Sequence, residues 1–304
     1  MYHYVRDFKN SAFPRIKALS SENFRTQIGH IRKNYRPISL ADLLAAIKTG
    51  GELPKKAVLL TFDDGYKDHF INVLPVLDRY KIQGSFFPPA KAILEHKVLD
   101  VNKIHFILAS AENKREIVDY ILAKIKAKRF EFKLETAEFY YNKFAAAGRF
   151  DDGPTVFIKK ILQKELPEKL RAEIIDWLFK KFVSLDESGF AEELYLNLAE
   201  LKSLRQAGMH IGGHGYSHLW LGDLKEVEQS REIKTSLAFL KQVGVDVKNW
   251  AFSYPYGSYN ENLLALLKKN GCQAGFGVEA RAADLGSDNP LVLPRLDTND
   301  LPIK

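Results

Sequence analysis

Two carboxylates stand side by side in a motif that could do chemistry. Residues 61–65 read TFDDG, and they place Asp63 and Asp64 directly after the apolar run 57–60. Adjacent carboxylates repel each other, so holding both at one strand end is costly unless they share a cation or a proton. The pair therefore indicates metal binding or proton transfer. The alternative is that one aspartate only caps a helix beginning near Tyr66.

A second motif could supply nitrogen ligands. Residues 214–218 read HGYSH and follow the strand-like run 209–213, so His214 and His218 lie four positions apart. Imidazoles at this spacing can reach one centre, although two unrelated surface histidines would look the same. Two neutral nitrogens and one carboxylate oxygen together form a 2-His-1-carboxylate metal set, which leaves positions open for water and substrate.

The elements that must position these motifs alternate between strands and helices. Short apolar runs occur at residues 2–5, 58–62, 85–87, 209–212, 250–253, 275–278 and 291–293. Helical patterns lie between them, for example over residues 223–243, with Gly244 as the expected end. This alternation predicts an α/β fold with a parallel sheet, whose strand ends carry the reactive side chains.

The pattern changes between about residues 97 and 198, where long helical segments replace the strand-like runs. We expect one barrel domain over residues 1–304, interrupted by this helical insertion. Lysines such as Lys124 and Lys126 stand there among aromatic residues such as Phe130 and Tyr140. That mixture is typical of a solvated basic face over an aromatic core. A lid that recognises an anionic or lipid-linked substrate is the alternative.

Composition excludes several classes of protein. With 304 residues, 46% hydrophobic and 27% charged, the chain is neither disordered nor fibrous. A net charge of +7 suits an anionic substrate but does not indicate nucleic acid. No apolar run approaches the length of a membrane helix, and the first residues lack a signal-peptide pattern, so we expect a cytoplasmic protein. The single Cys272 excludes an intramolecular disulfide, and nothing indicates an oligomeric state.

The order and separation of the two motifs resemble those of the polysaccharide deacetylases, also called the NodB homology family or carbohydrate esterase family 4. Residues 253–257 (SYPYG) are similar to a third motif of that family. The resemblance covers about residues 1–95 and 199–300 and leaves the helical insertion outside. It implies a distorted (β/α) barrel of seven or eight strands with a helical insertion.

The resemblance also implies roles for individual residues. It makes Asp64, His214 and His218 the metal ligands. It makes Asp63 the catalytic base, and the backbone N–H of Tyr256 a donor to the oxyanion. The implied cofactor is a divalent ion that polarises the acetamide carbonyl and activates water. Zinc is the expected ion, and cobalt, nickel and iron are the alternatives.

Substrate contacts are expected from three side chains near these motifs: Trp220, Tyr254 and Pro255. Trp220 and Tyr254, together with Tyr216 and Tyr256, could form an aromatic wall against a sugar ring, although aromatic residues at strand ends often serve packing alone.

Two positions depart from the family pattern. Ser253 stands where the family has an arginine that orients the catalytic aspartate, and a neutral hydroxyl cannot supply that charge. We expect Arg295 to fill this role from another strand, with a plain surface arginine as the alternative. No histidine follows His218, so the usual general acid is missing. His3 or a protonated Asp63 could serve, and the acid stays unassigned.

We therefore expect the chain to be a metal-dependent hydrolase that removes an N-acetyl group from an amino sugar or glycan intermediate in surface polysaccharide biosynthesis. Whether that sugar is nucleotide-linked or lipid-linked is left open. One alternative is hydrolysis of another small amide on the same fold. The other is a carbohydrate-binding pseudoenzyme, but Asp63 argues against it because a binding site needs no second acid beside the ligand.

Overall fold

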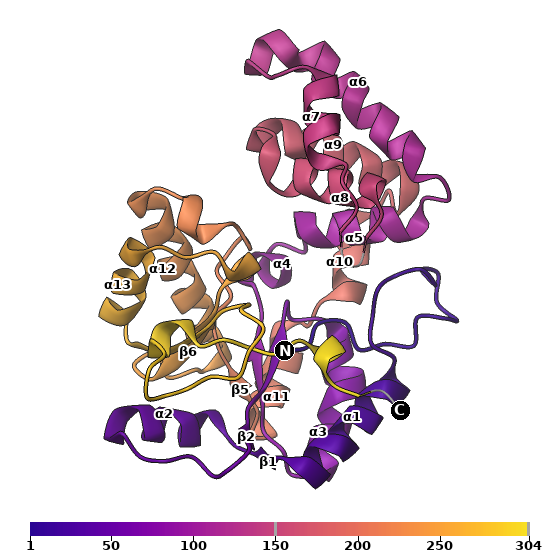
Figure 1. Ribbon diagram of the computed structural model, residues 1–304. Helices are drawn as coiled ribbons and strands as arrows, with labels where there is room; N and C mark the ends of the chain where they lie inside the picture. The colour runs from indigo at the N-terminus through magenta and orange to yellow at the C-terminus, as the bar shows by residue number, and fades with distance from the viewer. Residues whose placement is uncertain (149–150, 303–304) are drawn as a thin grey trace. The chain divides into compact units, whose positions relative to one another are not determined.

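The computed structural model describes residues 1–148 and 151–302, which form two compact units. The first unit comprises residues 1–7, 18–97 and the described chain from residue 191 onward. The second comprises residues 8–17 and the described part of 98–190. The helices of the second unit have magenta to salmon colours in Figure 1.

Parallel strands form the centre of the first unit. Strand β3 (Leu60–Asp63) pairs with β4 (Gly84–Phe87), and β4 pairs with β5 (His210–Ile211). Strand β6 (Trp250–Ser253) pairs with β7 (Cys272–Phe276). A separate short pair joins β1 (Arg36–Pro37) to β2 (Ala57–Val58). Every one of these pairings is parallel, as the alternation of strands and helices predicted.

Single parallel bridges connect these strands into a distorted barrel. Tyr2 bridges to β3, Gly213 just after β5 bridges to β6, and Leu293 bridges to β7. Beside the last segment, the nitrogen of Met1 donates to the carbonyl oxygen of Leu296 at 2.6 Å. Within the described residues, seven parallel segments thus follow one another from Tyr2 through β3, β4, β5, β6 and β7 to Leu293. The predicted distorted (β/α) barrel is confirmed.

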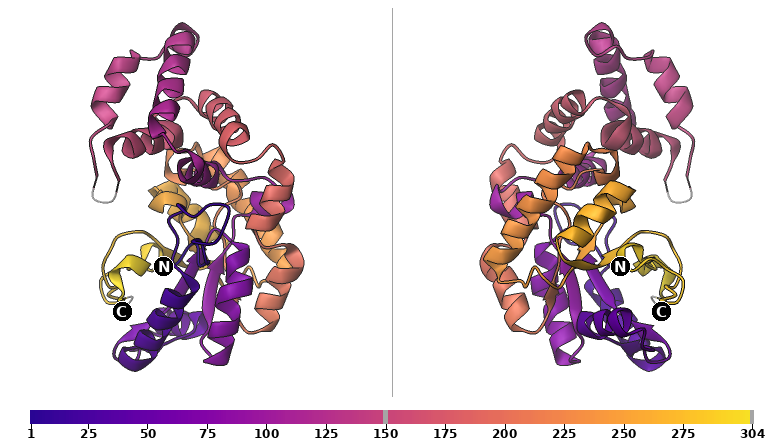
Figure 2. Two further views of the ribbon diagram at one scale, coloured as in Figure 1. Left: turned by 90° about the vertical axis from the view of Figure 1, so that its right-hand side faces the viewer. Right: turned by 90° about the vertical axis from the view of Figure 1, so that its left-hand side faces the viewer.

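Helices flank these strands (Figures 1 and 2). The α-helices are α1 (Ser21–Asn34), α2 (Leu40–Thr49), α3 (Leu74–Arg79), α4 (Ala90–Leu94), α11 (Leu198–Gln206), α12 (Glu226–Val243) and α13 (Glu261–Lys269). Short helical turns are η1 (His69–Val73), η3 (Leu221–Asp223), η4 (Pro255–Gly257), η5 (Pro290–Val292) and η6 (Thr298–Asp300). The expected end of the helix over 223–243 is confirmed, because Gly244 caps α12 in a left-handed conformation.

The second unit is helical. It contains α5 (Asp100–Ser110), α6 (Lys114–Phe132), α7 (Ala137–Phe144), α8 (Gly153–Lys160), η2 (Ile161–Glu165) and α9 (Glu168–Phe182), and α10 (Glu187–Leu194) begins in it. Lys103 is buried in this unit and pairs with Asp176 at 2.6 Å and Glu187 at 3.0 Å. None of the helices in the described chain has the length and apolar character needed to cross a membrane.

Aromatic rings fill the first unit between the strands. Phe62 of β3 stacks on Phe86 of β4 with centroids 4.7 Å apart, and Tyr2 stacks on the same Phe62 at 5.1 Å. All three side chains are buried. Strands covered on both sides need apolar residues throughout, which explains why the sequence shows continuous apolar runs here.

The last parallel segment approaches β7 closely at Gly275. A Cβ atom built there would lie 1.9 Å from the carbonyl oxygen of Leu291, while the nitrogen of Leu293 donates to the oxygen of Gly275 at 2.7 Å. At Gly277, two residues further on, the nearest atoms would be 3.7 Å from a built Cβ. Only glycine therefore fits the first position, whereas the second has room for a methyl group.

We expect Gly275→Ala to lower the free energy of unfolding by about 2 kcal/mol or more, because the added methyl group must displace backbone atoms. Gly277→Ala is the matched control and should stay within about 0.5 kcal/mol of the native chain. Urea unfolding followed by circular dichroism measures both. Equal stabilities for the two variants would contradict the close approach.

His69 is a buried histidine in the same unit. Its Nε2–H donates to the carbonyl oxygen of His3 at 2.9 Å. Burial lowers the pKa of His69 from 6.5 to about 4. The unfolded chain therefore binds a proton more readily than the folded chain between these pH values. This histidine makes the free energy of unfolding fall as the pH falls through that window.

On acidification from about pH 6.5 to about pH 4, we expect the free energy of unfolding to fall more steeply in the native chain than in His69→Gln. The difference between the two slopes should be up to about 1.4 kcal/mol per pH unit, which is the contribution of one histidine. Urea unfolding at a series of pH values gives the two slopes. His30→Gln is the matched control, because it makes the same substitution at a histidine whose ring contacts Asn34 at the surface. A native slope in His69→Gln would refute the expectation.

Candidate metal centre

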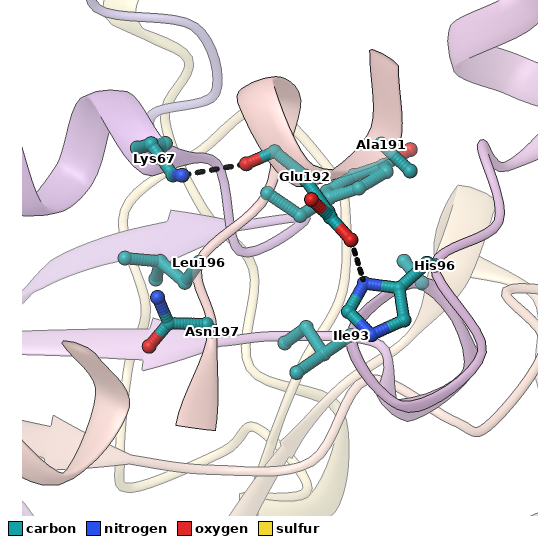
Figure 3. A pocket seen from close by; sticks show the side chains of 9 residues that line it. Lys67, Ile93, His96, Ala191, Glu192, Leu196 and Asn197 are labelled. Carbon is teal, nitrogen blue, oxygen red and sulfur yellow. Dashed lines mark hydrogen bonds and ion pairs between the residues drawn. The ribbon is translucent and has the colours of Figure 1, made fainter. Parts of the chain in front are cut away.

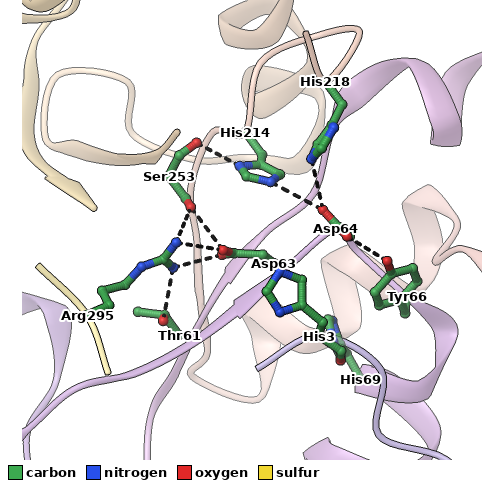
Figure 4. Close-up of polar contacts among 10 residues, drawn as sticks. All are labelled: His3, Thr61, Asp63, Asp64, Tyr66, His69, His214, His218, Ser253 and Arg295. Carbon is green, nitrogen blue, oxygen red and sulfur yellow. Dashed lines mark hydrogen bonds and ion pairs between the residues drawn. The ribbon is translucent and has the colours of Figure 1, made fainter. Parts of the chain in front are cut away.

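The carboxylates of residues 61–65 lie at the carboxyl end of β3. Asp63 is the last residue of the strand, and Asp64 has a left-handed backbone with φ 69°, followed by Gly65 with φ 65°. This turn directs the two side chains toward different partners, as Figure 4 shows. Both side chains are buried, so each needs a partner that compensates its charge.

Asp64 faces the two histidines of residues 214–218. Its Oδ1 lies 3.3 Å from Nε2 of His214 and 3.2 Å from Nε2 of His218 (Figure 4). The potential ligand atoms of the three residues all lie within 4.8 Å of one another, and all three residues are buried. The hydroxyl of Tyr66 donates to the other carboxylate oxygen at 2.5 Å. The structure thus brings the three expected ligands together.

The hydrogen bonds around this cluster fit a metal ion. Nδ1 of His214 lies 2.7 Å from the carbonyl oxygen of Ser253, which can only accept, so Nδ1 carries the proton and Nε2 presents its lone pair to the cluster. Oδ1 of Asp64 is buried and receives no hydrogen bond from the described residues. A carboxylate oxygen in this position is costly without a cation. One carboxylate and two imidazoles are donors that zinc accepts.

Metal binding requires an ionised carboxylate and neutral imidazoles, and two of the three residues, Asp64 and His218, have pKa values shifted in the direction that favours this. Burial alone would raise the pKa of Asp64, but its contacts with His214 and His218 hold that pKa well below the usual range. Burial lowers the pKa of His218. Burial acts in the same direction on His214, but contact with Asp64 and the charge of Asp63 outweigh it and raise its pKa. A cation therefore competes with a proton mainly at His214.

Asp63 forms a separate cluster with Arg295. The guanidinium donates to both carboxylate oxygens, from Nη1 to Oδ1 at 3.1 Å and from Nη2 to Oδ2 at 2.8 Å. Its Nε donates to the carbonyl oxygen of Gly277 at 2.8 Å, and Nη1 donates to the hydroxyl of Thr61 at 3.2 Å. Burial alone would raise the pKa of Asp63, but the charge of Arg295 holds it below the usual range. The arginine is buried, so a plain surface arginine is excluded.

Two contributing residues were not indicated by the sequence patterns. Ser253, noted there only for lacking charge, donates from Oγ to Asp63 at 3.1 Å and accepts from Arg295 at 3.0 Å. Tyr66 follows the 61–65 motif directly in the sequence, and this position is the signal that its hydroxyl could reach Asp64. Their hydroxyl groups complete the contacts of the two carboxylates.

Aromatic side chains border the cluster on one side. Tyr256 has φ 58° in the turn η4, and its ring stacks on Trp220 with centroids 4.4 Å apart and an interplanar angle of 2°. The same ring meets His218 edge-on at 4.9 Å. In contrast, Tyr254 and Pro255 are buried, and the Tyr254 hydroxyl donates to the oxygen of Leu291 at 2.7 Å. The structure keeps these two side chains within the packing rather than on a surface.

His3 lies beside both aspartates in Figure 4. Its side chain is half-buried, and its carbonyl oxygen accepts the hydrogen bond from His69 described above. The first strand segment therefore does bring this histidine to the cluster. His210, which precedes His214 and His218 in the chain, has both ring nitrogens buried without a hydrogen-bond partner among the described residues, and burial lowers its pKa to about 3.

A pocket of about 250 Å³ lies in the first unit (Figure 3). Its lining consists of Lys67, Ala92, Ile93, His96, Ala191, Glu192, Tyr195, Leu196 and Asn197. Lys67 Nζ donates to the carbonyl oxygen of Glu192 at 2.5 Å. The ring of Tyr195 stacks on Tyr66, with centroids 6.1 Å apart, and Tyr66 in turn bonds Asp64. Tyr195, which lines the pocket, is therefore in contact with Asp64 through the ring of Tyr66.

Comparison with solved structures shows the same fold. The chain is similar to the Streptococcus pyogenes deacetylase PplD in complex with acetate, with a TM-score of 0.57 and 17% identity over 97% of this chain and 89% of that one. It is similar to IcaB from Ammonifex degensii with a TM-score of 0.57 and 16% identity, over 97% and 88% of the two chains. At these identities the likeness concerns the fold alone.

Comparison of sequences shows the family. Over 88 residues the chain is 37% identical to the poly-β-1,6-N-acetyl-D-glucosamine N-deacetylase of Escherichia coli K12, which is 29% of this chain but only 13% of that protein. The model of the family described as polysaccharide deacetylase matches residues 50–133 and 141–275, and thus most of the chain. Both motifs that carry the buried aspartates and histidines lie inside the matched residues. The chain therefore belongs to the polysaccharide deacetylase family.

Proposed function

We propose that this chain is a metal-dependent hydrolase that removes the N-acetyl group from an amino sugar of a surface glycan. The observation that carries the proposal is the pair of buried clusters at the end of β3. Asp64 lies with two imidazoles, and Asp63 lies with a guanidinium. The name of the Escherichia coli relative supports a polymer of N-acetylglucosamine as the substrate, in preference to a nucleotide-linked or lipid-linked sugar.

The metal site is assigned to Asp64, His214 and His218. A divalent ion bound there would polarise the amide carbonyl and lower the pKa of water toward neutrality, which an unreactive acetamide requires. We propose zinc because this donor set suits it, with cobalt, nickel or iron as the alternatives that metal analysis would distinguish. The chain orients His214 for this task through the bond from Nδ1 to the Ser253 carbonyl oxygen.

Asp63 is proposed as the base that takes a proton from the attacking water. Arg295 keeps its carboxylate ionised, so it is able to accept a proton at neutral pH. The same charge makes Asp63 a weak base, so its contribution depends on accurate placement as well as on basicity. That placement is supplied by Arg295 and Ser253, which both hold Oδ2. Arg295 thus acts through Asp63, as a positioning residue.

The remaining roles are assigned to groups around these clusters. We place the backbone N–H of Tyr256 at the developing oxyanion, because its left-handed turn lies next to His218. His3, beside both aspartates, is proposed to return a proton to the departing amine, which its position supports over a protonated Asp63. The stacked rings of Trp220 and Tyr256 are proposed as the wall that contacts a sugar ring.

The direct test is hydrolysis of β-1,6-linked N-acetylglucosamine oligomers by the purified chain. We expect release of acetate with appearance of free amines, abolished by a chelator and restored by zinc or cobalt. N-formyl and cyclic amides offered in parallel would identify the alternative hydrolase. Metal bound without turnover of any acylated substrate would instead establish a carbohydrate-binding pseudoenzyme and refute the proposal.

Replacing Asp63 by asparagine should separate metal binding from turnover. Asp63→Asn keeps the size of the side chain but removes the group that accepts the proton, so kcat should fall by about 10²- to 10⁴-fold. Metal content, measured by elemental analysis after dialysis, should remain that of the native chain because Asp64 and the histidines are unchanged. Retained activity would exclude Asp63 as the base.

Replacing Arg295 should impair turnover through Asp63. Arg295→Ala removes the two-point contact, so we expect kcat to fall at least about tenfold, with zinc affinity little changed. Arg295→Lys should recover part of this loss, because one ammonium replaces the charge but not the two-point geometry. The matched control is Arg281→Ala, which removes an exposed arginine paired with Asp288 and Glu279. Unimpaired turnover in Arg295→Ala would refute the positioning role.

A further inference from the structure

The two histidines of the cluster are held in different ways. His214 is oriented through its own ring, because Nδ1 bonds the carbonyl oxygen of Ser253 at 2.7 Å. Nδ1 of His218 is buried but has no hydrogen-bond partner in the described part of the chain. The backbone of His218 is moreover left-handed, with φ 57°. A non-glycine residue keeps such a conformation only where the surrounding structure imposes it.

A buried carboxylate imposes the conformation of the residues just before His218. Glu232 on α12 is 8% exposed, and its Oε2 accepts from the backbone nitrogen of Tyr216 at 2.8 Å and of Ser217 at 2.9 Å. Burying a carboxylate is costly unless it is hydrogen-bonded. Bonds from N–H groups to a charged acceptor are stronger than bonds to a neutral one. Glu232 therefore fixes two consecutive amides of the 214–218 loop.

The opposite side of the loop is also bonded. The oxygen of Tyr216 accepts from the nitrogen of Lys91 at 2.9 Å, and the oxygen of Gly215 accepts from the nitrogen of Ala90 at 3.4 Å. A Cβ atom built at Gly215 would lie 3.4 Å from Oε2 of Glu232, so the loop passes close to this carboxylate. The loop is held between α12 and the start of α4, and Glu232 is the side chain that holds it.

We propose that Glu232 is a positioning residue of the metal centre. By fixing the amides of Tyr216 and Ser217, it presents Nε2 of His218 to Asp64 and takes the place of the ring contact that orients His214. This inference rests on the proposed metal-dependent function. It assigns Glu232 no contact with the substrate or with the metal ion.

The dissociation constants of Zn²⁺ and Co²⁺, measured on the full chain by competition with a chromophoric chelator, test this role without any assay of activity. Glu232→Ala should raise both constants about 10- to 100-fold, the usual effect of losing a group that orients a ligand. Glu232→Gln keeps an oxygen acceptor but loses its charge, so we expect a rise of about 3- to 10-fold. The matched control is Glu226→Ala, because Glu226 is an exposed glutamate on the same helix and its replacement removes the same charge. This control should leave both dissociation constants at their native values.

A second readout separates positioning from general stability. The visible absorption of bound Co²⁺ reports its coordination geometry, and it should change in the Glu232 variants but not in Glu226→Ala. A purely structural role would lower only the unfolding midpoint of the metal-free chain, with constants and spectrum unchanged, and that result would overturn the inference. If Glu232→Ala does not fold, Glu232→Gln decides by the same criterion. Failure of the native chain to bind either metal would instead refute the proposed function.

Discussion

Two neighbouring carboxylates, both buried, can exist in this fold only because each faces its own nitrogen partners. Asp63 lies against the guanidinium of Arg295, and Asp64 lies against two imidazoles. The left-handed turn at Asp64 and Gly65 separates the two side chains, which would otherwise repel each other in a medium of low dielectric constant. Once separated, Asp64 lies with two imidazoles and Asp63 with a guanidinium, which is the arrangement on which the proposed roles of a metal ligand and a base depend. The different surroundings of the two carboxylates thus follow from the backbone of one turn.

The barrel gathers the partners of that turn from distant parts of the chain. Parallel strands end at the same edge, so groups that follow β3, β5, β6 and β7 meet there. The close approach at Gly275 lets the last segment pack against β7, and Arg295 reaches Asp63 from it. Ser253 then acts as a hydroxyl between carboxylate and guanidinium. The positive charge beside Asp63 thus comes from the last segment, while position 253 supplies a neutral hydroxyl.

Several basic residues of the helical unit form ion pairs with acidic residues. Lys124 pairs with Glu173, Lys126 pairs with Glu138, and the buried Lys103 pairs with two acidic residues. Exposed pairs of this kind contribute little to stability, but they neutralise the lysines that make the sequence of this unit look basic. They favour a solvated face over a surface that attracts anions, so the function proposed here depends on the residues of the barrel.

Local patterns in the sequence were sufficient for the alternating strands and helices, for the end of α12 at Gly244, and for the two motifs, because periodicity, caps and short spacings depend on near neighbours. The family resemblance named the three residues that the structure brings together. Pairings between distant residues were decided by the tertiary structure, since they depend on strand order and close approach. The family resemblance suggested Arg295 as the partner of Asp63, but no local pattern indicates this pairing, because the two residues are 232 positions apart. The burial of Tyr254 and the bonds of Glu232 to the 214–218 loop are likewise not indicated by any periodicity in the sequence. The sequence therefore determined which chemical groups are present, while the fold decided which of them face each other.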